Sequence, residues 1–422
     1  MKLIVRPSRL SGAIAVPGSK SHTIRGIVAA LQSSGKSVLR VPLNSDDTRS
    51  ALDAARLFGA EVWEYPDRWE ICGVNGKLKD PGCVVNMNNS GTGLRMLAAL
   101  AAMQEFPVSF DGDESLRTRL MEGLFGALEI LGVKINSANG KCPFTIQGPV
   151  RGGETKVDGR SSQFLTSLLF ALPAAEQNSI IKLDYLYEQP YVSITEKWLT
   201  GLGIKFKRSA DMLFWEIPGG QKFSAFDKVI PADFSTACFA LAAGALCGNC
   251  VKILNLDFDD AQGDKQVFDF YEQMGADITR NPGEVIVNAP ESLQAVTLDL
   301  NSTPDALPVI SATASFIPGE TRLVNVAQAR NKETDRITVM REELTKMGGD
   351  ITEQPDGMII RGRKLHGAEV ESHGDHRIAM ALAVAGLAAD GETVINEAEC
   401  IAVTYPGFVD DFRALGADFR VE

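Results

Sequence analysis

Basic residues, glycines and serines gather in short segments that lead into apolar runs of this chain. The segments are PGSKSHTIR at Pro17–Arg25, NNSGTGLR at Asn88–Arg95, GRSSQF at Gly159–Phe164, TPDALP at Thr303–Pro308 and HGDHR at His373–Arg377. The start of a helix presents unpaired N–H groups and a partial positive charge, a combination that binds phosphate and carboxylate groups. These segments therefore predict helix starts that bind anions.

Three further segments lead into amphipathic stretches: LRTR at Leu116–Arg119, QPYVSIT at Gln189–Thr195 and ARNKETDR at Ala329–Arg336. An isolated serine or aspartate before an apolar run is usually only a helix cap. A basic residue in the first turn, however, opposes the helix dipole, and repeating this at matched positions indicates a site. The basic residues that oppose the dipole in this way are Lys20, Arg25, Arg119, Lys332 and Arg336, and Arg95 and Arg377 join them in one cationic set. We expect them to bind a multiply anionic small molecule between two lobes.

A six-fold repeat predicts the frame that positions these residues. Six similar short segments each contain a glycine that is followed three residues later by an apolar residue. These glycines are Gly59, Gly132, Gly203, Gly275, Gly348 and Gly416, with gaps of 73, 71, 72, 73 and 68 residues. A glycine that ends a helix before an apolar run is typical of a C-cap followed by a strand. A fixed period indicates repeated supersecondary units.

Each repeat also contains an apolar helix without a polar stripe, which predicts burial on all sides. The expected helix starts are Lys20, Gly91, Ser161, Asp233, Asp305 and Asp375. The second helix of each unit is amphipathic, as VFDFYEQM and ITVMREELTKM illustrate. We therefore expect an α/β (α+β) fold with apolar helices inside and sheets outside.

The ends of the chain suggest two domains. The sixth unit stops after one strand, and strand-like Lys2–Val16 precedes the first buried helix. We predict that this stretch completes the last unit, so that residues 1–18 and 231–422 form domain I and residues 19–230 form domain II. The active site is expected in the cleft between them. Two domains of roughly 200 residues agree with usual domain sizes.

Composition sets further limits. A net charge of −12 argues against binding nucleic acid through bulk charge. The longest apolar runs, about a dozen residues, are too short for a bilayer span, and no secretory signal is visible. Seven scattered cysteines favour a reduced, cytoplasmic protein. Neither Cys247–Cys250 nor the pair His373 and His376 indicates a metal site, and no cofactor is expected.

In order and spacing, PGSKSHTIR, NNSGTGLR, SSQFLTSLLFALP, TPDALP, RNKETDR and DHRIAMA resemble the 5-enolpyruvylshikimate-3-phosphate synthase family. The resemblance covers essentially the whole chain. It implies two inside-out α/β domains, each built from three βαβαββ units, and we expect a monomer. It also implies transfer of the enolpyruvyl group of phosphoenolpyruvate to the 5-hydroxyl of shikimate 3-phosphate, with release of phosphate, in the pathway to chorismate.

The resemblance also assigns site residues. Contacts to shikimate 3-phosphate fall on Lys20, Ser21, Arg25, Ser161, Ser162, Gln163, Tyr191, Asp305, Gln328 and Lys332. Contacts to phosphoenolpyruvate fall on Lys20, Asn89, Gly91, Arg119, Gln163, Arg336 and Arg377. In the implied addition–elimination reaction, Asp305 takes the hydroxyl proton and Glu333 protonates the methylene carbon, with help from Lys20.

Two residues depart from the family pattern. Val403 stands where relatives typically carry lysine, and Glu188 stands where they often have serine. Two other functions therefore stay open: a transferase with a different acceptor, such as UDP-N-acetylglucosamine, and a protein that only senses anionic metabolites. The residue pair Lys20–Ser21 argues against the first, because transferases of that acceptor typically have Lys-Asn there.

Overall fold

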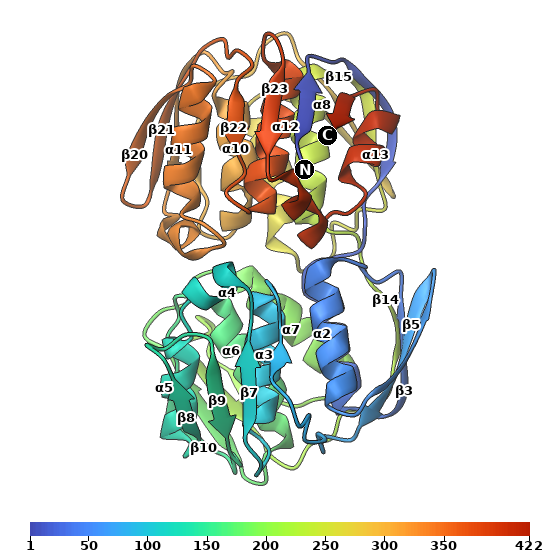
Figure 1. Ribbon diagram of the computed structural model, residues 1–422, viewed down its shortest axis with the longest axis vertical. Coiled ribbons are helices and arrows are strands. Elements are labelled where there is room, and N and C mark those ends of the chain that lie inside the picture. The colour runs from blue at the N-terminus through green and yellow to red at the C-terminus, as the bar shows by residue number, and fades with distance from the viewer. The chain divides into compact units, whose positions relative to one another are not determined.

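The computed structural model describes residues 1–422, which form two compact units. Unit 1 comprises Met1–Pro17 and Pro231–Glu422, and unit 2 comprises Gly18–Ile230. The chain thus leaves unit 1 after Pro17 and returns to it after Ile230 (Figure 1). Each unit mixes helices and sheets, as expected for an α/β fold. None of the helices combines the length and apolar character that a bilayer crossing requires.

Unit 2 contains three buried helices and three outer ones. The buried helices are α1 (Lys20–Gln32), α3 (Gly91–Ala101) and α6 (Ser162–Ala171), and the outer ones are α2 (Asp46–Leu57), α5 (Glu122–Ile130) and α7 (Gln189–Gly201). The short helix α4 (Glu114–Thr118) precedes α5, and a 3₁₀ turn, η1 (Leu172–Ala174), follows α6. Helix α3 packs against both α1 and α6.

Three four-stranded sheets surround the helices of unit 2. Their orders are β14-β3-β5-β4, β6-β7-β9-β8 and β10-β11-β13-β12. The strands are β3 (Ser34–Arg40), β4 (Glu61–Tyr65), β5 (Arg68–Val74), β6 (Val85–Asn86), β7 (Val108–Asp111), β8 (Lys134–Ser137), β9 (Phe144–Gln147), β10 (Gly153–Lys156), β11 (Ser179–Lys182), β12 (Lys207–Arg208), β13 (Phe214–Ile217) and β14 (Asp227–Val229). In each sheet the first two strands are parallel and the remaining pairs are antiparallel.

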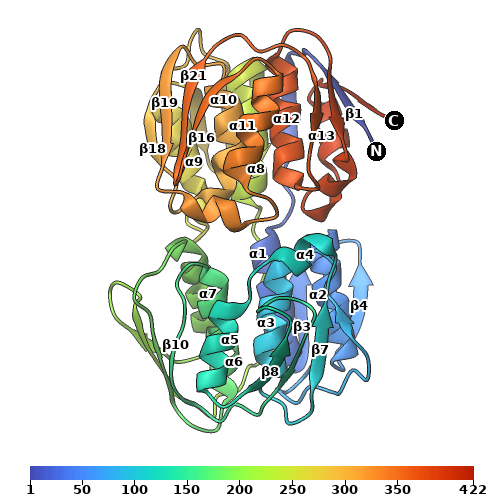
Figure 2. The ribbon, with the colours of Figure 1, turned by 60° about the vertical axis from the view of Figure 1, so that its left-hand side comes forward.

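Unit 1 repeats this plan. Its buried helices are α8 (Phe234–Cys247), α10 (Leu307–Ala314) and α12 (His376–Ala388), and its outer helices are α9 (Gln266–Gln273), α11 (Arg336–Lys346) and α13 (Phe408–Ala414). Its 3₁₀ turns are η2 (Gly263–Lys265), η3 (Pro304–Ala306), η4 (Ala327–Asn331) and η5 (Ala398–Val403). Figure 2 shows α8, α10 and α12 side by side, with strands such as β18 and β19 at the margin of the unit.

The sheets of unit 1 have the orders β16-β17-β15-β2, β18-β19-β21-β20 and β22-β23-β1-β24. The strands are β1 (Leu3–Arg6), β2 (Leu10–Ala15), β15 (Gly248–Leu254), β16 (Asp277–Asn281), β17 (Glu284–Asn288), β18 (Thr297–Asp299), β19 (Gly319–Val324), β20 (Asp350–Gln354), β21 (Gly357–Gly362), β22 (Glu369–Glu371), β23 (Thr393–Asn396) and β24 (Asp418–Val421).

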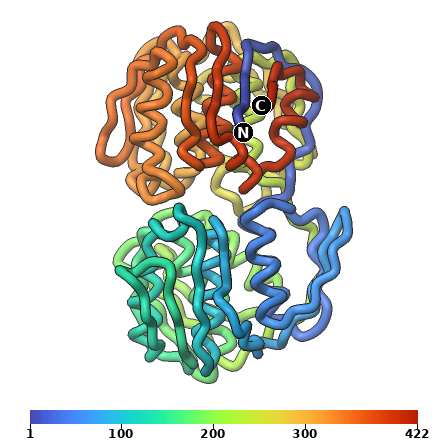
Figure 3. The backbone as a smooth tube through the Cα atoms, viewed as in Figure 1, coloured from blue at the N-terminus to red at the C-terminus, as the bar shows by residue number.

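The N-terminal stretch forms two strands with different partners. Strand β1 lies between β23 and β24, with Leu3 opposite Ile395 and Val421, and so completes the last sheet. Strand β2 instead runs parallel to β15 at the edge of the sheet β16-β17-β15-β2. The two chain ends therefore lie together in unit 1, as Figure 3 shows.

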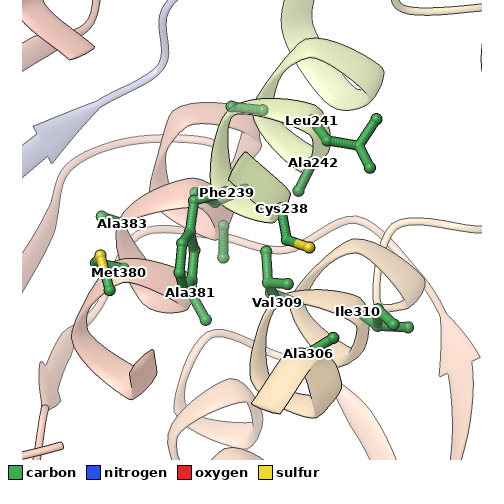
Figure 4. Packing of buried hydrophobic residues seen from close by; sticks show 14 of the residues in the cluster. Cys238, Phe239, Leu241, Ala242, Ala306, Val309, Ile310, Met380, Ala381 and Ala383 are labelled. Atoms are coloured by element: carbon green, nitrogen blue, oxygen red, sulfur yellow. The ribbon is translucent and has the colours of Figure 1, made fainter. Parts of the chain in front are cut away.

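The buried helices fill the core of each unit. Helix α8 contains no charged residue and is buried along almost its whole length. In unit 1, Phe239 from α8, Val309 from α10 and Met380 from α12 meet at the centre of this core (Figure 4). Transfer of such apolar surface out of water supplies the main stabilisation of this arrangement. The prediction of apolar helices inside sheets is confirmed.

The predicted helix ends and starts are also confirmed, with one difference. All six repeat glycines have a positive φ: +102°, +90°, +76°, +86°, +91° and +102° in chain order. A side chain is strained in this conformation, which explains glycine at each helix end. Five buried helices begin at, or one residue after, the predicted residue; around Asp305 a 3₁₀ turn, η3, comes first and α10 begins at Leu307.

Candidate active site

Arg336 organises the site residues of unit 1. It is the first residue of α11, follows the cap Asp335, and has a fully buried side chain. Its guanidinium donates to Asp375 through Nε (2.8 Å), to Asp305 through Nη1 (2.9 Å) and to Glu333 through Nη2 (2.6 Å). Burial would lower the pKa of Arg336, but the three carboxylates raise it above its ordinary value. Such pairing is what a buried charge requires.

Asp305 lies in η3 and faces three basic side chains. Besides Arg336, Nη2 of Arg377 lies 3.2 Å from Oδ2 of Asp305, and Nζ of Lys332 lies 3.5 Å from Oδ1. Burial would raise the pKa of the Asp305 carboxyl, but the charges of Arg377, Lys332 and Arg336 lower it well below its ordinary range. Asp305 is therefore ionised at neutral pH, as a proton acceptor must be.

Gln328 lies in η4 and is buried, with Nε2 donating to the backbone oxygen of Asn301 (2.9 Å). The predicted residues of unit 1 thus come from η3, η4, the segment after η4, and the starts of α11 and α12. Together with Asp375, which the sequence argument did not assign to the site, they form the unit 1 site: Asp305, Gln328, Lys332, Glu333, Arg336, Asp375 and Arg377. Contacts between Arg336, Asp305, Asp375 and Arg377 link the starts of α10, α11 and α12.

Lys20 begins α1 in unit 2. Its Nζ lies 3.0 Å from Oδ2 of Asp47, a buried residue in the first turn of α2. The pair joins the starts of two helices and holds the ammonium group of Lys20 in place. No part of the sequence argument identified Asp47, whose position resembles that of an ordinary acidic residue near a helix start.

Arg25 is fully buried and links α1 to α7. It donates through Nε to Oγ1 of Thr195 (2.9 Å), through Nη1 to the backbone oxygen of Ser21 (3.0 Å), and through Nη2 to that of Tyr191 (2.9 Å). Burial lowers the pKa of Arg25 to about 10, so the side chain keeps its charge at neutral pH. Arg25 therefore fixes the backbone that carries Ser21 and Tyr191.

Two guanidinium groups converge on Gly91, the first residue of α3. A Cβ added to Gly91 would lie 2.8 Å from Nη1 of Arg119 and 3.2 Å from Nη1 of Arg95. Arg119 also donates to Oδ1 of Asn89 (2.5 Å), and Arg95 donates to Oε1 of Gln163. Because glycine leaves this space open, the paired forks can grip an anion against the start of α3.

The start of α6 carries the two predicted serines. Ser161 is the cap residue, and its hydroxyl accepts from the backbone N–H of Gln163 (3.3 Å). The buried hydroxyl of Ser162 donates to Oε2 of Glu188 (2.9 Å). Glu188 is itself buried and has a left-handed backbone at the cap of α7. Glu188, which departs from the family pattern in the sequence, therefore binds Ser162 of the serine pair.

We call the predicted residues of unit 2 the unit 2 site: Lys20, Ser21, Arg25, Asn89, Gly91, Arg119, Ser161, Ser162, Gln163 and Tyr191. Contacts between its residues and their neighbours link the starts of α1 with α2 and α7, of α3 with α6, and of α6 with α7. Three details of the sequence argument were wrong. Arg25 is the sixth residue of α1 and lies beyond its first turn. Arg119 and Lys332 follow α4 and η4 as C-caps, where the helix dipole favours a cation, so they do not break the dipole rule.

The model of the EPSP synthase (3-phosphoshikimate 1-carboxyvinyltransferase) family matches residues 4–412 of this chain. The match spans nearly all of the 422 residues and both units. The chain belongs to the EPSP synthase family.

Relatives in the EPSP synthase family match from end to end. The chain is 44% identical to the 3-phosphoshikimate 1-carboxyvinyltransferase of Ruminiclostridium cellulolyticum, with 100% of both chains covered. It is 42% identical to the enzyme of the same name from Acetivibrio thermocellus, with 99% of each chain covered. Among solved structures, EPSP synthase from Acinetobacter baumannii matches with a TM-score of 0.83, 27% identity and full coverage of both chains. The predicted resemblance and fold class are confirmed.

Sequence reasoning missed the acids that hold the basic residues of this EPSP synthase family member. Asp375 was taken only as a helix start, yet both of its oxygens bind Arg336 (2.8 and 3.2 Å). The signal was present in DHRIAMA, where an acid that precedes a buried helix stands two residues before an arginine. The other departure, Val403, is half-buried at the end of η5, which packs against α12.

Proposed function

We propose that this protein transfers the enolpyruvyl group of phosphoenolpyruvate to the 5-hydroxyl of shikimate 3-phosphate and releases phosphate. This reaction lies in the shikimate pathway to chorismate and the aromatic amino acids. Its strongest single support is the family match over residues 4–412, together with relatives of this name that align over their full length.

The unit 1 site supports the chemistry of this proposal. The charges of Arg377, Lys332 and Arg336 lower the pKa of Asp305, which weakens it as a base but keeps it in the carboxylate form that can accept the 5-hydroxyl proton. Glu333 lies within 2.6 Å of the same guanidinium of Arg336 and is the proposed acid for the methylene carbon. Addition followed by elimination through a tetrahedral intermediate requires one group of each kind.

The substrate contacts proposed for the two sites follow the chemistry of their residues. Forked guanidinium groups suit the carboxylate and phosphate of phosphoenolpyruvate, and we assign Arg119, Arg336 and Arg377 to them. Shikimate 3-phosphate is assigned to the serine pair at the start of α6, which offers hydroxyl and helix N–H groups. We further propose that units 1 and 2 are the two domains expected from the sequence, with Gly18 in unit 2 rather than in domain I.

The protein is proposed to act as a cytoplasmic monomer without metal or cofactor. Its seven cysteines are free thiols, which is the state that a reducing compartment maintains. A net charge of −12 also disfavours nucleic acid as a partner. Size-exclusion chromatography with light scattering tests the monomer directly, since a dimer would double the measured mass.

A phosphate-release assay tests the activity. The protein is mixed with phosphoenolpyruvate and either shikimate 3-phosphate, unphosphorylated shikimate or UDP-N-acetylglucosamine. Release with shikimate 3-phosphate alone supports the proposal, whereas release with UDP-N-acetylglucosamine indicates the other transferase. Tight binding of shikimate 3-phosphate by calorimetry, without any phosphate release, would instead indicate a sensor of anionic metabolites.

A further inference from the structure

Glu343 is a buried carboxylate on α11, seven residues and thus about two turns after Arg336. It accepts hydrogen bonds from Nζ of Lys346 (2.7 and 2.9 Å), from the backbone N–H of Glu371 (2.9 Å) and from Nε2 of His373 (2.8 Å). Burial would raise the pKa of Glu343, but the bonds from His373, Lys346 and Glu371 lower it. Glu343 is therefore an ionised acceptor for three donors.

Two of these donors belong to the tight turn between β22 and α12. Within this turn His373 has φ +53° and Gly374 has φ +69°. A left-handed conformation at a residue other than glycine is strained and persists only where surrounding contacts hold it. Glu343 supplies such contacts to the side chain of His373 and, at the start of the turn, to the backbone N–H of Glu371.

The turn ends at Asp375, the cap of α12. Its backbone N–H donates to the backbone oxygen of Ser372 (3.0 Å), so the turn fixes where the carboxylate of Asp375 lies. That carboxylate accepts from Nε and Nη2 of Arg336 and from the backbone N–H of Arg377 (2.9 Å). Asp375 therefore sets the orientation of Arg336 and the start of the helix that carries Arg377.

We propose that Glu343 is a positioning residue for phosphoenolpyruvate binding, acting through the turn at Glu371–Asp375 on the guanidinium groups of Arg336 and Arg377. The inference rests on the proposed function of these two arginines. Glu343 touches neither of them, and its effect passes through the position of Asp375. Changing Glu343 should therefore alter the binding of phosphoenolpyruvate far more than the binding of shikimate 3-phosphate.

Glu343→Gln tests the inference with little change in shape. Glutamine has an NH₂ group in place of one carboxylate oxygen, so it offers no charged acceptor and only one of the two acceptor positions that the Glu371 N–H and His373 use in the wild type. We expect the apparent KM for phosphoenolpyruvate to rise about tenfold, the effect of losing one good hydrogen bond to a charged group. The KM for shikimate 3-phosphate should stay within about twofold, since the unit 2 serines are untouched.

Lys346→Ala is the matched control, because Lys346 binds both oxygens of Glu343 from the solvent side and does not belong to the turn. Lys346→Ala should leave both KM values unchanged.

His373→Gln keeps a side-chain donor for Glu343, so its KM for phosphoenolpyruvate should stay closer to the wild-type value than that of His373→Gly, which removes the donor while relieving the left-handed strain. Equal KM changes for both substrates, or an effect of Lys346→Ala as large as that of Glu343→Gln, would overturn the inference.

Amide hydrogen exchange tests, without any need for turnover, whether Glu343 holds the turn at Glu371–Asp375. In Glu343→Gln the amides of residues 371–375 should exchange at least about tenfold faster than in the wild type, and in Lys346→Ala they should not. Unchanged exchange in Glu343→Gln would contradict the inference. If the wild type released no phosphate while the exchange result held, the proposed function would be wrong, but the role of Glu343 in holding the turn would be supported.

Discussion

Nη1 of Arg336 lies 2.9 Å from Oδ1 of Asp305, so the first residue of α11 directly binds the carboxylate that precedes α10. The same guanidinium is held by Asp375 at the start of α12. One arginine thus aligns groups from three helix starts, which explains how residues distant in sequence form a single site.

Asp305→Asn should abolish most of the turnover. The amide keeps the shape but cannot accept the hydroxyl proton, so kcat should fall by about 100-fold or more. Phosphate release at saturating substrates measures the effect. Asp390→Asn, which changes an exposed aspartate paired with Lys364, serves as the control. Near-normal turnover of Asp305→Asn would show that another group is the base.

Gly91→Ala should weaken binding of phosphoenolpyruvate without unfolding the protein. The new methyl group would lie 2.8 Å from Nη1 of Arg119, which must move away. Because that atom ends a flexible side chain, we expect an unchanged melting temperature and a KM for phosphoenolpyruvate about tenfold higher. In Gly126→Ala the added methyl group meets nothing within 4 Å, so its KM should not change. Identical KM values in the two variants would contradict the account.

Arg25→Ala should reduce stability as well as activity. It removes hydrogen bonds to Thr195, Ser21 and Tyr191 in a buried position, so the free energy of unfolding should fall by about 3 kcal/mol. Urea denaturation provides the measurement. Arg40→Ala removes an exposed pair with Asp227 and should cost less than about 1 kcal/mol. Equal losses in both variants would mean that Arg25 is not a structural link.

Val403→Lys should lower the KM for phosphoenolpyruvate several-fold. Val403 ends η5, which packs against the helix of Arg377, and a lysine there would add a positive charge near the proposed anion site. Steady-state kinetics would show the effect, with Val421→Lys on exposed β24 as a control. An unchanged KM would mean that the existing basic residues already satisfy the anion.

The buried carboxyl group of Asp264 should make the free energy of unfolding fall as pH rises. Burial, and then the negative charge of Asp305, raise its pKa to about 6 in the folded protein, above the ordinary value of 3.8. Folding therefore favours the protonated form. The resulting stabilisation is fully present below about pH 4 and is lost as pH rises through about 6, an effect on the order of 3 kcal/mol.

Asp264→Asn should remove this pH dependence. The amide oxygen can still accept from Ser235, which contacts the carboxylate in the wild type. We expect the variant to be more stable than the wild type at pH 7.5 and to lose the decline between pH 4 and 6. Urea midpoints across this range test the expectation, and parallel curves for both proteins would refute it.

Periodicity made the fold predictable because each repeat must bury one apolar helix and end it at a glycine with positive φ. The helix starts at Lys20 and Gly91 follow directly from that rule. The separate pairing of β2 with β15 was not predictable, because strand-like residues do not reveal their partner. The turn η3 at Asp305 was also missed, since Pro304 and Pro308 leave both helix types possible.

Sequence patterns single out the basic residues of the unit 1 and unit 2 sites but not their acidic partners. Lys20 and Arg336 stand out because they oppose the dipole of the helix that they begin. Asp47 and Glu343 look like ordinary helix acids in the sequence, and only burial separates them from solvated ones. Burial depends on the packing of distant elements, which local patterns do not specify.

Phosphorus NMR of one reaction mixture tests the central claim most directly. With phosphoenolpyruvate, shikimate 3-phosphate and this protein, the signal of phosphoenolpyruvate should disappear while inorganic phosphate and one new phosphate monoester appear in equal amounts. A spectrum that stays unchanged over many hours, with the protein folded and both substrates present, would contradict the account.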